Sequence, residues 1–599
     1  MFREKILEKI KTALTFLSIS NEGVSISSPA NDSFGDYSTN IALKLSKSKK
    51  KNQLKIGKNI AGAIDKGDLI EKIEVIKPGF INIWIKDDIL LKNLQKIDEN
   101  YGNNDLNKGQ KIIHEFTDPN PFKEMHIGHL YSNTIGESLS RLQAALGADV
   151  RRVNYQGDVG MHVAKSIWGL QKRMKDENVT LANLEKKELT ERIKFLGKSY
   201  SIGSTAYEED KKAAEEMKNI NYLVYASAQQ VLVEKENWEP QVDYMQFVKG
   251  ESIELSEVKK LYEHGRKWSL EYFETIYKRM GTKFDFYFFE SIVGEYGIKI
   301  VKEFLEKGIF EKSDGAIVFP GKKFGLHTRV FINSLGLPTY EAKELGLAPT
   351  KFSKFPYDRS IIITGNEINE YFKVLLTALS KTNPELAKKT RHIGHGMVRL
   401  PEGKMSSRTG KVLTGKWLLD EVKKKSKVEV EKGAKVDAKD VDEVSERLTI
   451  AAIKYSFLKQ GVGNDIAFDI NESLSLQGNS GPYLEYTYAR CKSVLGKISD
   501  KKNKINEKVG LNDEELSLLR HLSKYEEVVL DAAEYYAPSN ICTYLYDLAQ
   551  KYNLFYQKNP ILKADNEDQK NLRIAITQAT AHVLSHGLNL LGIKTVEKM

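Results

Sequence analysis

A strand, a turn, a helix and a second strand follow one another between residues 111 and 160, and this order constrains the fold more than any other feature of the chain. The apolar run KIIHEF leads into a turn that contains Pro119 and Pro121. Apolar residues at helical spacing follow, at Ile135, Leu139, Leu142 and Leu146. The segment ADVRRVNYQGDVG then predicts a second strand. A strand–helix–strand unit implies a parallel sheet, so we expect a Rossmann-type domain.

The remaining patterns predict a multidomain α/β + α chain. Strand signals resume at GAIVFP (315–320) and RSIIITG (359–365), after a long charged helical stretch at about 167–280. We therefore expect a parallel-sheet domain over 110–425 with a helical insertion at 167–280.

The two ends of the chain have different patterns. Residues 1–98 mix helical runs such as FREKILEKIKTAL with strand-like runs such as EKIEVIK and FINIWIK, which predicts a small α+β domain. A stretch rich in Gly and Asn, at 99–110, is typical of a linker. From about 415 onward the apolar periodicity is helical, so we expect an all-helical domain over 426–599.

Composition excludes several classes of protein. The two cysteines, Cys491 and Cys542, are too few for a disulfide framework or a Cys-based zinc site. No apolar run approaches the ~20 residues that span a bilayer, and Glu4 and Glu8 interrupt the N-terminal apolar run. We expect no membrane contact and a reducing, cytoplasmic location. The formal net charge of +10 is a mild excess over 599 residues, which suits a polyanionic partner or an ordinary Lys-rich protein.

The tetrapeptide HIGH occurs twice, at 126–129 and at 392–395. The first copy lies where the predicted strand gives way to a helix, which is the ligand-binding edge of a parallel sheet and a favourable place for a phosphate. Surface or capping histidines and a metal-binding pair are the alternatives for His126 and His129. Gly394, Gly396 and Pro401 prevent a helix after the second copy. We expect its histidines to be incidental, although its backbone could line a nucleotide pocket.

The surroundings of the first copy favour a site. DPNP and Lys123 precede it, and the segment GKMSSRTG lies far downstream at 403–410. Alone, that segment is typical of a solvated basic loop. Paired with a strand–HIGH–helix unit, it predicts a mobile cationic flap that clamps a triphosphate.

This pairing resembles the HIGH and KMSKS motifs of the class I aminoacyl-tRNA synthetases. The finer resemblance is to the arginyl-tRNA synthetase family, on EFTDPNPFKEMHIGHLYSNTIGESLSR, VNYQGDVG, FDFYFFES, LPTYEAKELGLA, GMVRLPEGKMSSRTGKVL and GNSGPYLEYTYARCKSVL. It implies a tRNA-contacting N-terminal domain, a catalytic domain and an anticodon-binding helical domain. It also implies activation of L-arginine by ATP with Mg²⁺, without zinc, and transfer to the terminal ribose of tRNA(Arg) by a monomer.

The resemblance assigns roles to individual residues. His126 and His129 would donate to phosphate oxygens, Gly128 would leave room for adenine, and Lys404 and Arg408 would neutralise pyrophosphate. Further ATP-binding residues would be Gly365, Glu367, Met397, Val398, Met405 and Ser406. The family-wide KMSKS pattern has a second lysine where this chain has Ser407. Lys123 is the expected substitute, and a surface lysine in the first turn is the alternative.

Arginine itself calls for carboxylates, because a guanidinium is best held by a planar bidentate acceptor. By resemblance, the substrate contacts are Glu115, Asn120, Tyr340 and Glu344. The family usually has Asp at the last of these positions, and the extra methylene of Glu344 alters its reach. Without the resemblance, a buried aromatic and a helix-surface acid would be the simpler interpretations of Tyr340 and Glu344.

Two groups of residues are candidates for tRNA binding. Tyr483, Tyr486, Tyr488 and Arg490 interleave aromatic and basic side chains on one predicted helix. That pattern suits stacking on unpaired bases, although core tyrosines fit it nearly as well. In the N-terminal domain the candidates are Phe34, Asp36, Tyr37 and Asn40.

Two rival functions remain open at this stage. Another class I synthetase would share both motifs, but a cysteinyl enzyme needs zinc ligands and a glutamyl enzyme needs cations facing its amino acid. A non-catalytic tRNA-binding paralogue would keep the fold, but the intact His126, Gly128, His129 and Lys404 disfavour it.

Overall fold

The computed structural model describes residues 1–29, 31–49, 52–249, 254–400, 413–433, 436–498 and 505–599. The chain divides into two compact units. The first comprises Met1–Asn104, Glu429–Tyr455 and Leu474–Met599, and the second comprises Asp105–Val428 and Ser456–Ser473. Each unit therefore joins segments that are distant in the sequence.

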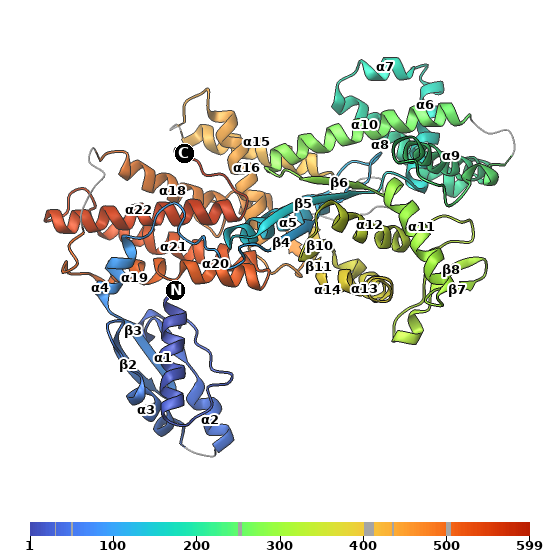
Figure 1. The fold of residues 1–599 in the computed structure, drawn as a ribbon. Coiled ribbons are helices and arrows are strands. Elements are labelled where there is room, and N and C mark those ends of the chain that lie inside the picture. The colour runs from blue at the N-terminus through green and yellow to red at the C-terminus, as the bar shows by residue number, and fades with distance from the viewer. Residues whose placement is uncertain (30, 50–51, 250–253, 401–412, 434–435, 499–504) are drawn as a thin grey trace. The chain divides into compact units, whose positions relative to one another are not determined.

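The second unit is built on a five-stranded parallel sheet (Figure 1). In spatial order its strands are β11 (Thr390–His395), β10 (Arg359–Gly365), β4 (Lys111–Glu115), β5 (Asp149–Gln156) and β6 (Phe286–Phe289). Every neighbouring pair is parallel. Helix α5 (Ile127–Ala145) joins β4 to β5. The predicted strand–helix–strand unit and the Rossmann-type sheet are confirmed.

The order of the strands creates a crevice in this sheet. From β4 the chain proceeds outward on one side through β5 and β6, and on the other side through β10 and β11. Helices α13 (Asn369–Thr382) and α14 (Pro384–Lys389) join the last two strands. The connections therefore diverge between β4 and β10, and an open parallel sheet binds its ligand at the carboxyl ends of the strands at this switch point.

A helical insertion separates β5 from β6, as predicted. It consists of α6 (Met161–Asp176), α7 (Leu181–Glu185), α8 (Leu189–Glu209), α9 (Lys211–Glu236), the short helix η2 (Tyr244–Phe247) and α10 (Leu255–Met280). Two glycines let α6 and α8 pack closely. A Cβ atom at Gly169 would lie 2.0 Å from the Ser199 carbonyl oxygen, and one at Gly203 would lie 2.0 Å from that of Lys165.

The strand at GAIVFP does not continue the parallel sheet, so that expectation is wrong. It is β8 (Ala316–Phe319), which forms a separate antiparallel sheet with β7 (Glu311–Ser313) and β9 (Arg329–Ile332). Only Asp314 and Gly315 join β7 to β8, and both have positive φ values. A two-residue connection makes a hairpin, whereas parallel strands need a long crossover.

Several shorter elements complete the second unit. Helices α11 (Glu290–Glu306) and α12 (Tyr340–Lys354) pack against each other, with η3 (Gly321–Phe324) and η4 (Asn366–Ile368) in the connections. A two-residue strand, β12 (Val398–Arg399), pairs with β13 (Ile466–Ala467) near α17 (Ile470–Ser473). Helices α15 (Gly415–Gly433) and α16 (Val441–Leu458) carry the chain between the units.

The N-terminal part of the first unit is a small α+β domain. Its antiparallel sheet has the order β1 (Tyr37–Thr39), β3 (Phe80–Ile85), β2 (Ile70–Ile76). Its helices are α1 (Phe2–Phe16), α2 (Ile41–Lys49), α3 (Gln53–Ala63) and α4 (Asp87–Leu94), with η1 (Asp32–Phe34) before β1. Ile6, Ile10 and Leu14 of α1 are buried, as the helical periodicity indicates.

The C-terminal part of the first unit is helical. It comprises α18 (Gly481–Leu495), α19 (Asp513–Leu522), α20 (Tyr525–Glu534), α21 (Pro538–Lys558) and α22 (Glu567–Leu590). Charged contacts attach the N-terminal domain to these helices within the unit. Arg3 makes a bidentate pair with Asp531, at 2.6 and 2.7 Å, and the Tyr37 hydroxyl donates to Glu527 at 2.7 Å.

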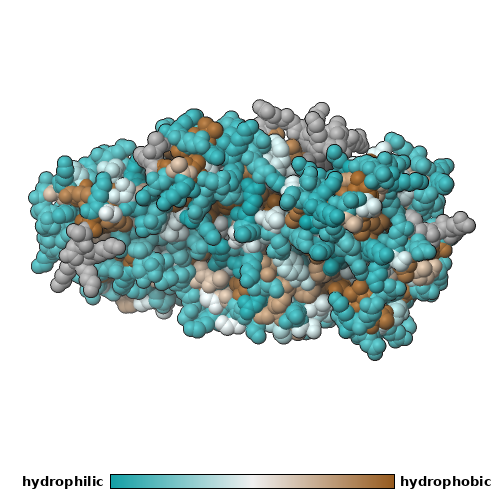
Figure 2. Space-filling model, turned by 90° about the horizontal axis from the view of Figure 1, so that it is seen from above, coloured by the Kyte–Doolittle hydropathy of each residue, from teal (hydrophilic) through white to brown (hydrophobic). Residues whose placement is uncertain are grey.

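The surface contains no continuous apolar band on the face drawn in Figure 2, where hydrophobic residues form scattered patches. Among the helices of the described residues, none is both long enough and apolar enough to cross a membrane.

Candidate active site

A cavity of about 460 Å³ opens at the carboxyl edge of the parallel sheet. Residues at or just beyond the ends of all five strands line it. They are Glu115 of β4, Gly157 after β5, Glu290 after β6, Gly365 of β10 and His395 of β11. The cavity thus lies where the topology places a ligand.

Most of the pocket residues predicted from the sequence line this cavity. They are Glu115, Asn120, His126, Gly128, His129, Tyr340, Glu344, Gly365, Glu367, Met397 and Val398. Lys123 is not among the lining residues, and its ammonium group lies 4.6 Å from the centre of the Tyr200 ring. Lys404, Met405, Ser406 and Arg408 lie in 401–412, outside the described residues.

The first HIGH copy begins α5. His126 directly precedes the helix, and its backbone N–H donates to Nδ1 of His129 at 3.1 Å. The two rings are stacked with their centroids 3.7 Å apart. Because Nδ1 of His129 accepts this hydrogen bond, the proton of the neutral ring resides on Nε2. His129 therefore presents an N–H donor on its other edge, at the N-terminus of α5.

Both imidazoles are kept neutral. Burial lowers the pKa of His129 well below its ordinary value, and the neighbouring His126 lowers it further. Part of His126 remains exposed, but burial also lowers the pKa of this ring, and the positive charge of Lys123 contributes to the shift. Gly128 allows the stacked arrangement, because a Cβ atom there would lie 2.9 Å from the His126 ring.

The chain on both sides of 401–412 reaches this site. On the N-terminal side, Met397 and Val398 line the cavity. On the C-terminal side, the Ile127 N–H donates to the Leu413 carbonyl at 3.3 Å, and the Gly415 N–H donates to the Met125 carbonyl at 2.7 Å. The segment that follows the predicted flap therefore pairs directly with the first HIGH copy.

Besides the exposed Glu367, four carboxylates line the cavity, and buried lysines balance two of them. Glu115 pairs with Lys351 at 2.5 Å, and Glu290 pairs with Lys343 at 2.5 Å. Asp118 accepts a hydrogen bond from the Tyr155 N–H at 2.8 Å, and Glu344 has no hydrogen bond or ion pair within the described part of the chain. Within the described residues, Asp118 and Glu344 thus remain without a cationic partner, which suits a ligand with two positive groups.

Burial raises the pKa of Glu344 and that of Asp118 well above their ordinary values, and the charge of Glu115 adds to both shifts. The surroundings of these two groups therefore favour their protonated forms. A bound cation would favour the ionised forms instead.

The turn that follows β4 is strained. Thr117 and Asp118 have φ values of +81° and +43°, although neither is glycine. Such residues cost about 1–3 kcal/mol each and cluster at ligand-binding sites. Asn120 in the same turn lies against Gly157, where a Cβ atom would come within 2.2 Å of the Asn120 Oδ1 atom. The glycine thus lets the Asn120 amide reach the cavity.

The second HIGH copy lies on β11, and its two histidines differ in role. The His392 ring stacks on Phe372 with centroids 3.8 Å apart and hydrogen-bonds the Thr364 hydroxyl at 2.7 Å. His395 lines the cavity and packs edge-on against Tyr131, with centroids 4.8 Å apart. The expectation that both histidines are incidental is therefore wrong for His395. Gly396, Met397 and Val398 line the cavity, in keeping with the expectation for this backbone.

The candidate anticodon-binding residues lie on two sides of α18. Arg490 donates to the Tyr486 hydroxyl at 3.0 Å and also pairs with Asn553, which donates to the Tyr483 hydroxyl at 3.0 Å. Tyr488 is buried, with 8% of its surface exposed. Tyr483, Tyr486 and Arg490 thus form one polar aromatic cluster, from which Tyr488 is separate.

Two of the candidate residues in the N-terminal domain serve its packing. Asp36 and Tyr37 are each 1% exposed. Asp36 accepts from the Ile85 N–H at 2.8 Å and lies 3.4 Å from Arg520, while Tyr37 bonds Glu527. Burial on this scale leaves no surface for a direct RNA contact. Phe34 is 45% exposed and remains accessible.

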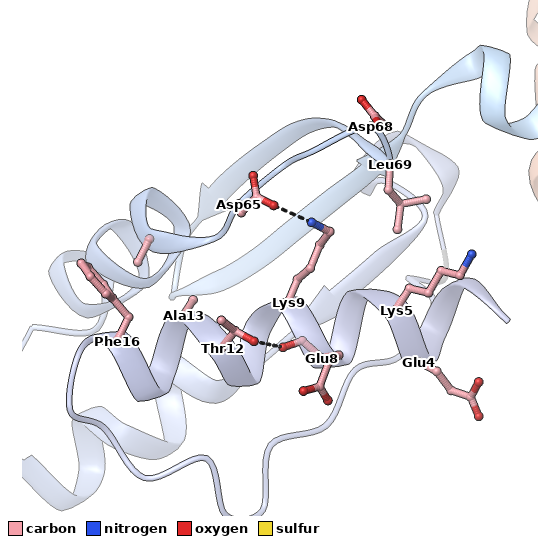
Figure 3. Close-up of a pocket in the computed structure, with 11 residues that line it drawn as sticks. Glu4, Lys5, Glu8, Lys9, Thr12, Ala13, Phe16, Asp65, Asp68 and Leu69 are labelled. Carbon is pink, nitrogen blue, oxygen red and sulfur yellow. Dashed lines mark hydrogen bonds and ion pairs between the residues drawn. The ribbon is translucent and has the colours of Figure 1, made fainter.

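A larger open hollow, of about 950 Å³, lies beside α1 in the N-terminal domain (Figure 3). Its charged lining residues are Glu4, Lys5, Glu8, Lys9, Asp65 and Asp68. Lys9 is paired with Asp65 at 2.8 Å. Acidic groups outnumber basic groups, so this hollow is unsuited to a phosphate backbone.

Sequence reasoning missed several lining residues, including Asp118, Tyr155, Glu290, Tyr371, Phe372 and His395. A signal existed for Glu290, which directly follows the aromatic run FYFF that forms β6. No group of three or more His, Cys, Asp or Glu side chains in the described ranges is arranged to hold a metal ion.

The fold and the cavity define a class I aminoacyl-tRNA synthetase catalytic domain. The family model for the catalytic domain of class I (R) tRNA synthetases matches residues 90–470. The model for the arginyl tRNA synthetase N-terminal domain matches residues 2–85, and the DALR anticodon binding domain model matches residues 484–599.

Curated relatives and solved structures agree. The arginine–tRNA ligase of Fusobacterium nucleatum is 33% identical and covers 96% of this chain and 95% of its own length, and that of Treponema denticola is 31% identical with the same coverage. The chain belongs to the arginyl-tRNA synthetase family. The arginyl-tRNA synthetase structures from Thermus thermophilus and Plasmodium falciparum share the fold, with TM-scores of 0.79 and 0.76, each at 22% identity. They cover 100% of this chain and, respectively, 100% and 99% of their own chains.

Proposed function

We propose that the cavity at the switch point carries out the arginine–tRNA ligase reaction of the family. The α-carboxylate of L-arginine attacks the α-phosphorus of ATP, and pyrophosphate leaves. The ribose hydroxyl of the terminal adenosine of tRNA(Arg) then attacks the carbonyl carbon of arginyl-adenylate, and AMP leaves. One observation carries this proposal: the first HIGH copy and the unpaired Glu344 line the same cavity.

The nucleotide end of the cavity is built by α5. His129 offers an Nε2–H donor, His126 offers a second neutral imidazole, and the first turn of the helix adds backbone N–H groups. These donors stabilise the negative charge that develops on the phosphate oxygens during in-line attack. Gly365, Glu367, Met397 and Val398 line the part of the cavity that we assign to the nucleoside.

Cations complete the phosphate site. We assign Lys404 and Arg408 to the departing pyrophosphate, and Met405 and Ser406 to ATP binding. The support is that Met397 and Val398, before 401–412, line the cavity, and that Leu413 and Gly415, after it, hydrogen-bond the backbone at the first HIGH copy. Lys123 supplies a further positive charge next to His126 and takes the place of the lysine that the flap lacks.

The arginine end is built by carboxylates. Glu344 has no cationic partner among the described residues, so it accepts the guanidinium group, with Tyr340 and Glu290 beside it. Glu115 is ion-paired with Lys351, so we assign it no direct bond to the guanidinium group, and its charge acts on the neighbouring carboxyl groups. Asp118 and Asn120 lie in the turn that leads to the HIGH copy, where the α-ammonium group must lie if the carboxylate is to reach ATP.

Mg²⁺ enters with the nucleotide in this proposal. This ion is usually held by substrate phosphates together with water and one or two carboxylates. When bound, it would neutralise charge on the phosphates as pyrophosphate leaves. The protein's own donors then need only to orient the two substrates.

Each end of the first unit supplies a tRNA contact. The cluster of Tyr483, Tyr486 and Arg490 on α18, extended by the Tyr556 ring 4.9 Å from the Arg490 guanidinium, offers stacking surfaces to unpaired anticodon bases. In the N-terminal domain, Phe34 and Asn40 are the remaining candidates. Asp36, Tyr37 and Tyr488 hold the packing that presents these residues.

We propose a three-part organisation with boundaries near residues 98, 110 and 426. We also propose that the protein acts as a monomer, as its resemblance to the family implies. A cytoplasmic location follows from the proposed substrates, tRNA and ATP.

Arginine-dependent exchange of labelled pyrophosphate into ATP tests this function. The assay is run with arginine, glutamate or cysteine, each with and without tRNA(Arg), because tRNA can be needed for activation. We expect exchange only with arginine. Exchange with another amino acid, or with none under any condition, would contradict the proposal.

A further inference from the structure

The helical insertion holds the stretch Phe122 to Glu124, which contains the candidate lysine. Phe122 has a φ value of +68° and its N–H donates to the Ser269 hydroxyl of α10 at 2.9 Å. Its ring is 1% exposed and fits against Gly265, where a Cβ atom would lie 2.2 Å from it. A bulky residue keeps a left-handed conformation only when its surroundings fix it, so α10 anchors this turn.

Helix α8 of the insertion supports the next two residues. The Lys123 ammonium group lies 4.6 Å from the centre of the Tyr200 ring, and Gly197, one turn earlier, lies beside Glu124. A Cβ atom at Gly197 would be 3.6 Å from the Glu124 carboxylate, so the helix passes along the turn at ordinary contact distance. Tyr200 therefore provides an aromatic surface for Lys123 that comes from a different part of the fold.

A lysine needs such support if it is to act on a phosphate. Its four-carbon side chain is flexible, so fixing it in one place costs conformational entropy. An aromatic face attracts the ammonium group through its quadrupole and restricts it without neutralising its charge. Lys123 on this surface stays close enough to the HIGH histidines for its charge to act on both rings.

We propose that Tyr200 is a positioning residue for adenylate formation, holding the Lys123 ammonium group ready for the ATP phosphates. This inference rests on the proposed role of Lys123 in the reaction. It gives the helical insertion a part in the chemistry, through α8 as the platform and α10 as the anchor of the turn.

Two substitutions at Tyr200 test the platform. Tyr200→Leu removes the ring, and we expect single-turnover adenylate formation to slow about three- to tenfold, with the KM for arginine unchanged. Tyr200→Phe keeps the ring and should retain the wild-type rate. Tyr207→Leu is the matched control, because Tyr207 lies on the same helix and carries Lys165 over its ring at 4.2 Å. That variant should leave the rate unchanged.

A double-mutant cycle separates positioning from general support of the fold. In a Lys123→Ala background, Tyr200→Leu should have no further effect, since no ammonium group remains to be positioned. A loss that persists in this background, or an equal loss in Tyr200→Phe, would overturn the inference. So would a wild-type rate in Tyr200→Leu while Lys123→Ala is slow. Full activity of Lys123→Ala would instead refute the role of Lys123 in the proposed function.

Discussion

The two HIGH copies have the same four residues, yet the structure uses them differently. The first copy lies at the start of α5, where its histidines stack on each other at the helix N-terminus. The second copy ends β11, where alternating side chains separate the two rings. His392 stacks on Phe372, while His395 reaches the cavity.

The backbone conformation decides what the tetrapeptide can do. Histidines three residues apart lie on one face of a helix start but point to opposite faces of a strand. Only the first arrangement aims two imidazoles and a helix N-terminus at one anion. The second arrangement contributes a cavity wall and a core contact.

Removing a donor from the first copy should have the largest effect. We expect His129→Ala to slow adenylate formation by about 10²–10³-fold, the usual result of losing one transition-state donor. Single-turnover kinetics with saturating ATP and arginine measures it. The matched substitution in the second copy is His392→Ala. An equal slowing in both variants would contradict the claim that only the first copy takes part in the chemistry.

Glu344→Gln sharpens the comparison between the two HIGH copies, because it should weaken arginine binding in the same cavity without changing a histidine. Losing a charge-assisted hydrogen bond to the guanidinium group should raise the KM for arginine by about 10–100-fold. The KM for ATP should change much less. Steady-state kinetics with each substrate varied in turn checks this. Glu344→Asp restores the charge with a shorter reach and should recover part of the loss. If Glu344→Gln weakened only the binding of ATP, Glu344 would belong to the nucleotide end of the cavity.

The two ends of the cavity should also differ in their response to pH. Because burial raises the pKa of Glu344, arginine must displace a proton, and its KM should rise as the pH falls through that raised value. The rise approaches tenfold per pH unit below the raised pKa. The lowered pKa values of His126 and His129 should keep the KM for ATP flat down to more acidic pH. A pH profile of both KM values tests this, and the control is Glu344→Gln, in which the pH dependence of the KM for arginine should be weaker.

His395→Ala probes the one histidine of the second copy that lines the cavity. Losing its ring and its edge-on contact with Tyr131 should raise the KM for ATP by about two- to tenfold with little change in kcat. Kinetics with ATP varied measures it. A loss in kcat as large as that of His129→Ala would show that the second copy shares the chemistry.

His392→Ala should change stability and leave catalysis intact. The lost ring stack and hydrogen bond should lower the free energy of unfolding by about 1–2 kcal/mol, measured by chemical denaturation. Burial lowers the pKa of His392 to about 4, so the unfolded chain takes up its proton first. The stabilisation from the neutral ring is present above pH 6.5 and is lost as the pH falls toward 4. A wild-type pH dependence of stability in His392→Ala would contradict this.

Local patterns predicted the parts of the fold that depend on neighbouring residues. The periodicity around β4, α5 and β5 was sufficient for the parallel unit. The cavity residues came from the resemblance to the arginyl-tRNA synthetase family and not from local patterns. The run at 315–320 was misassigned, because a short apolar run looks the same in a parallel sheet and in a hairpin. Local patterns also could not predict which residues would be paired with partners far away in the sequence.

Two pairs show this limit. Tyr37 is buried because Glu527 lies against it, 490 residues away in the chain. Glu115 is ion-paired with Lys351, 236 residues away, so its carboxylate is not free to bind the guanidinium group of arginine. Such pairs depend on tertiary packing, which no local pattern encodes.

A crystal structure with arginine and a non-hydrolysable ATP analogue tests the central claim most directly. The account predicts that His126 and His129 contact the phosphates, that Lys404 and Arg408 reach the β- and γ-phosphates, and that Glu344 contacts the guanidinium. A nucleotide bound with its phosphates away from the start of α5, or on His392 of the second copy, would contradict it.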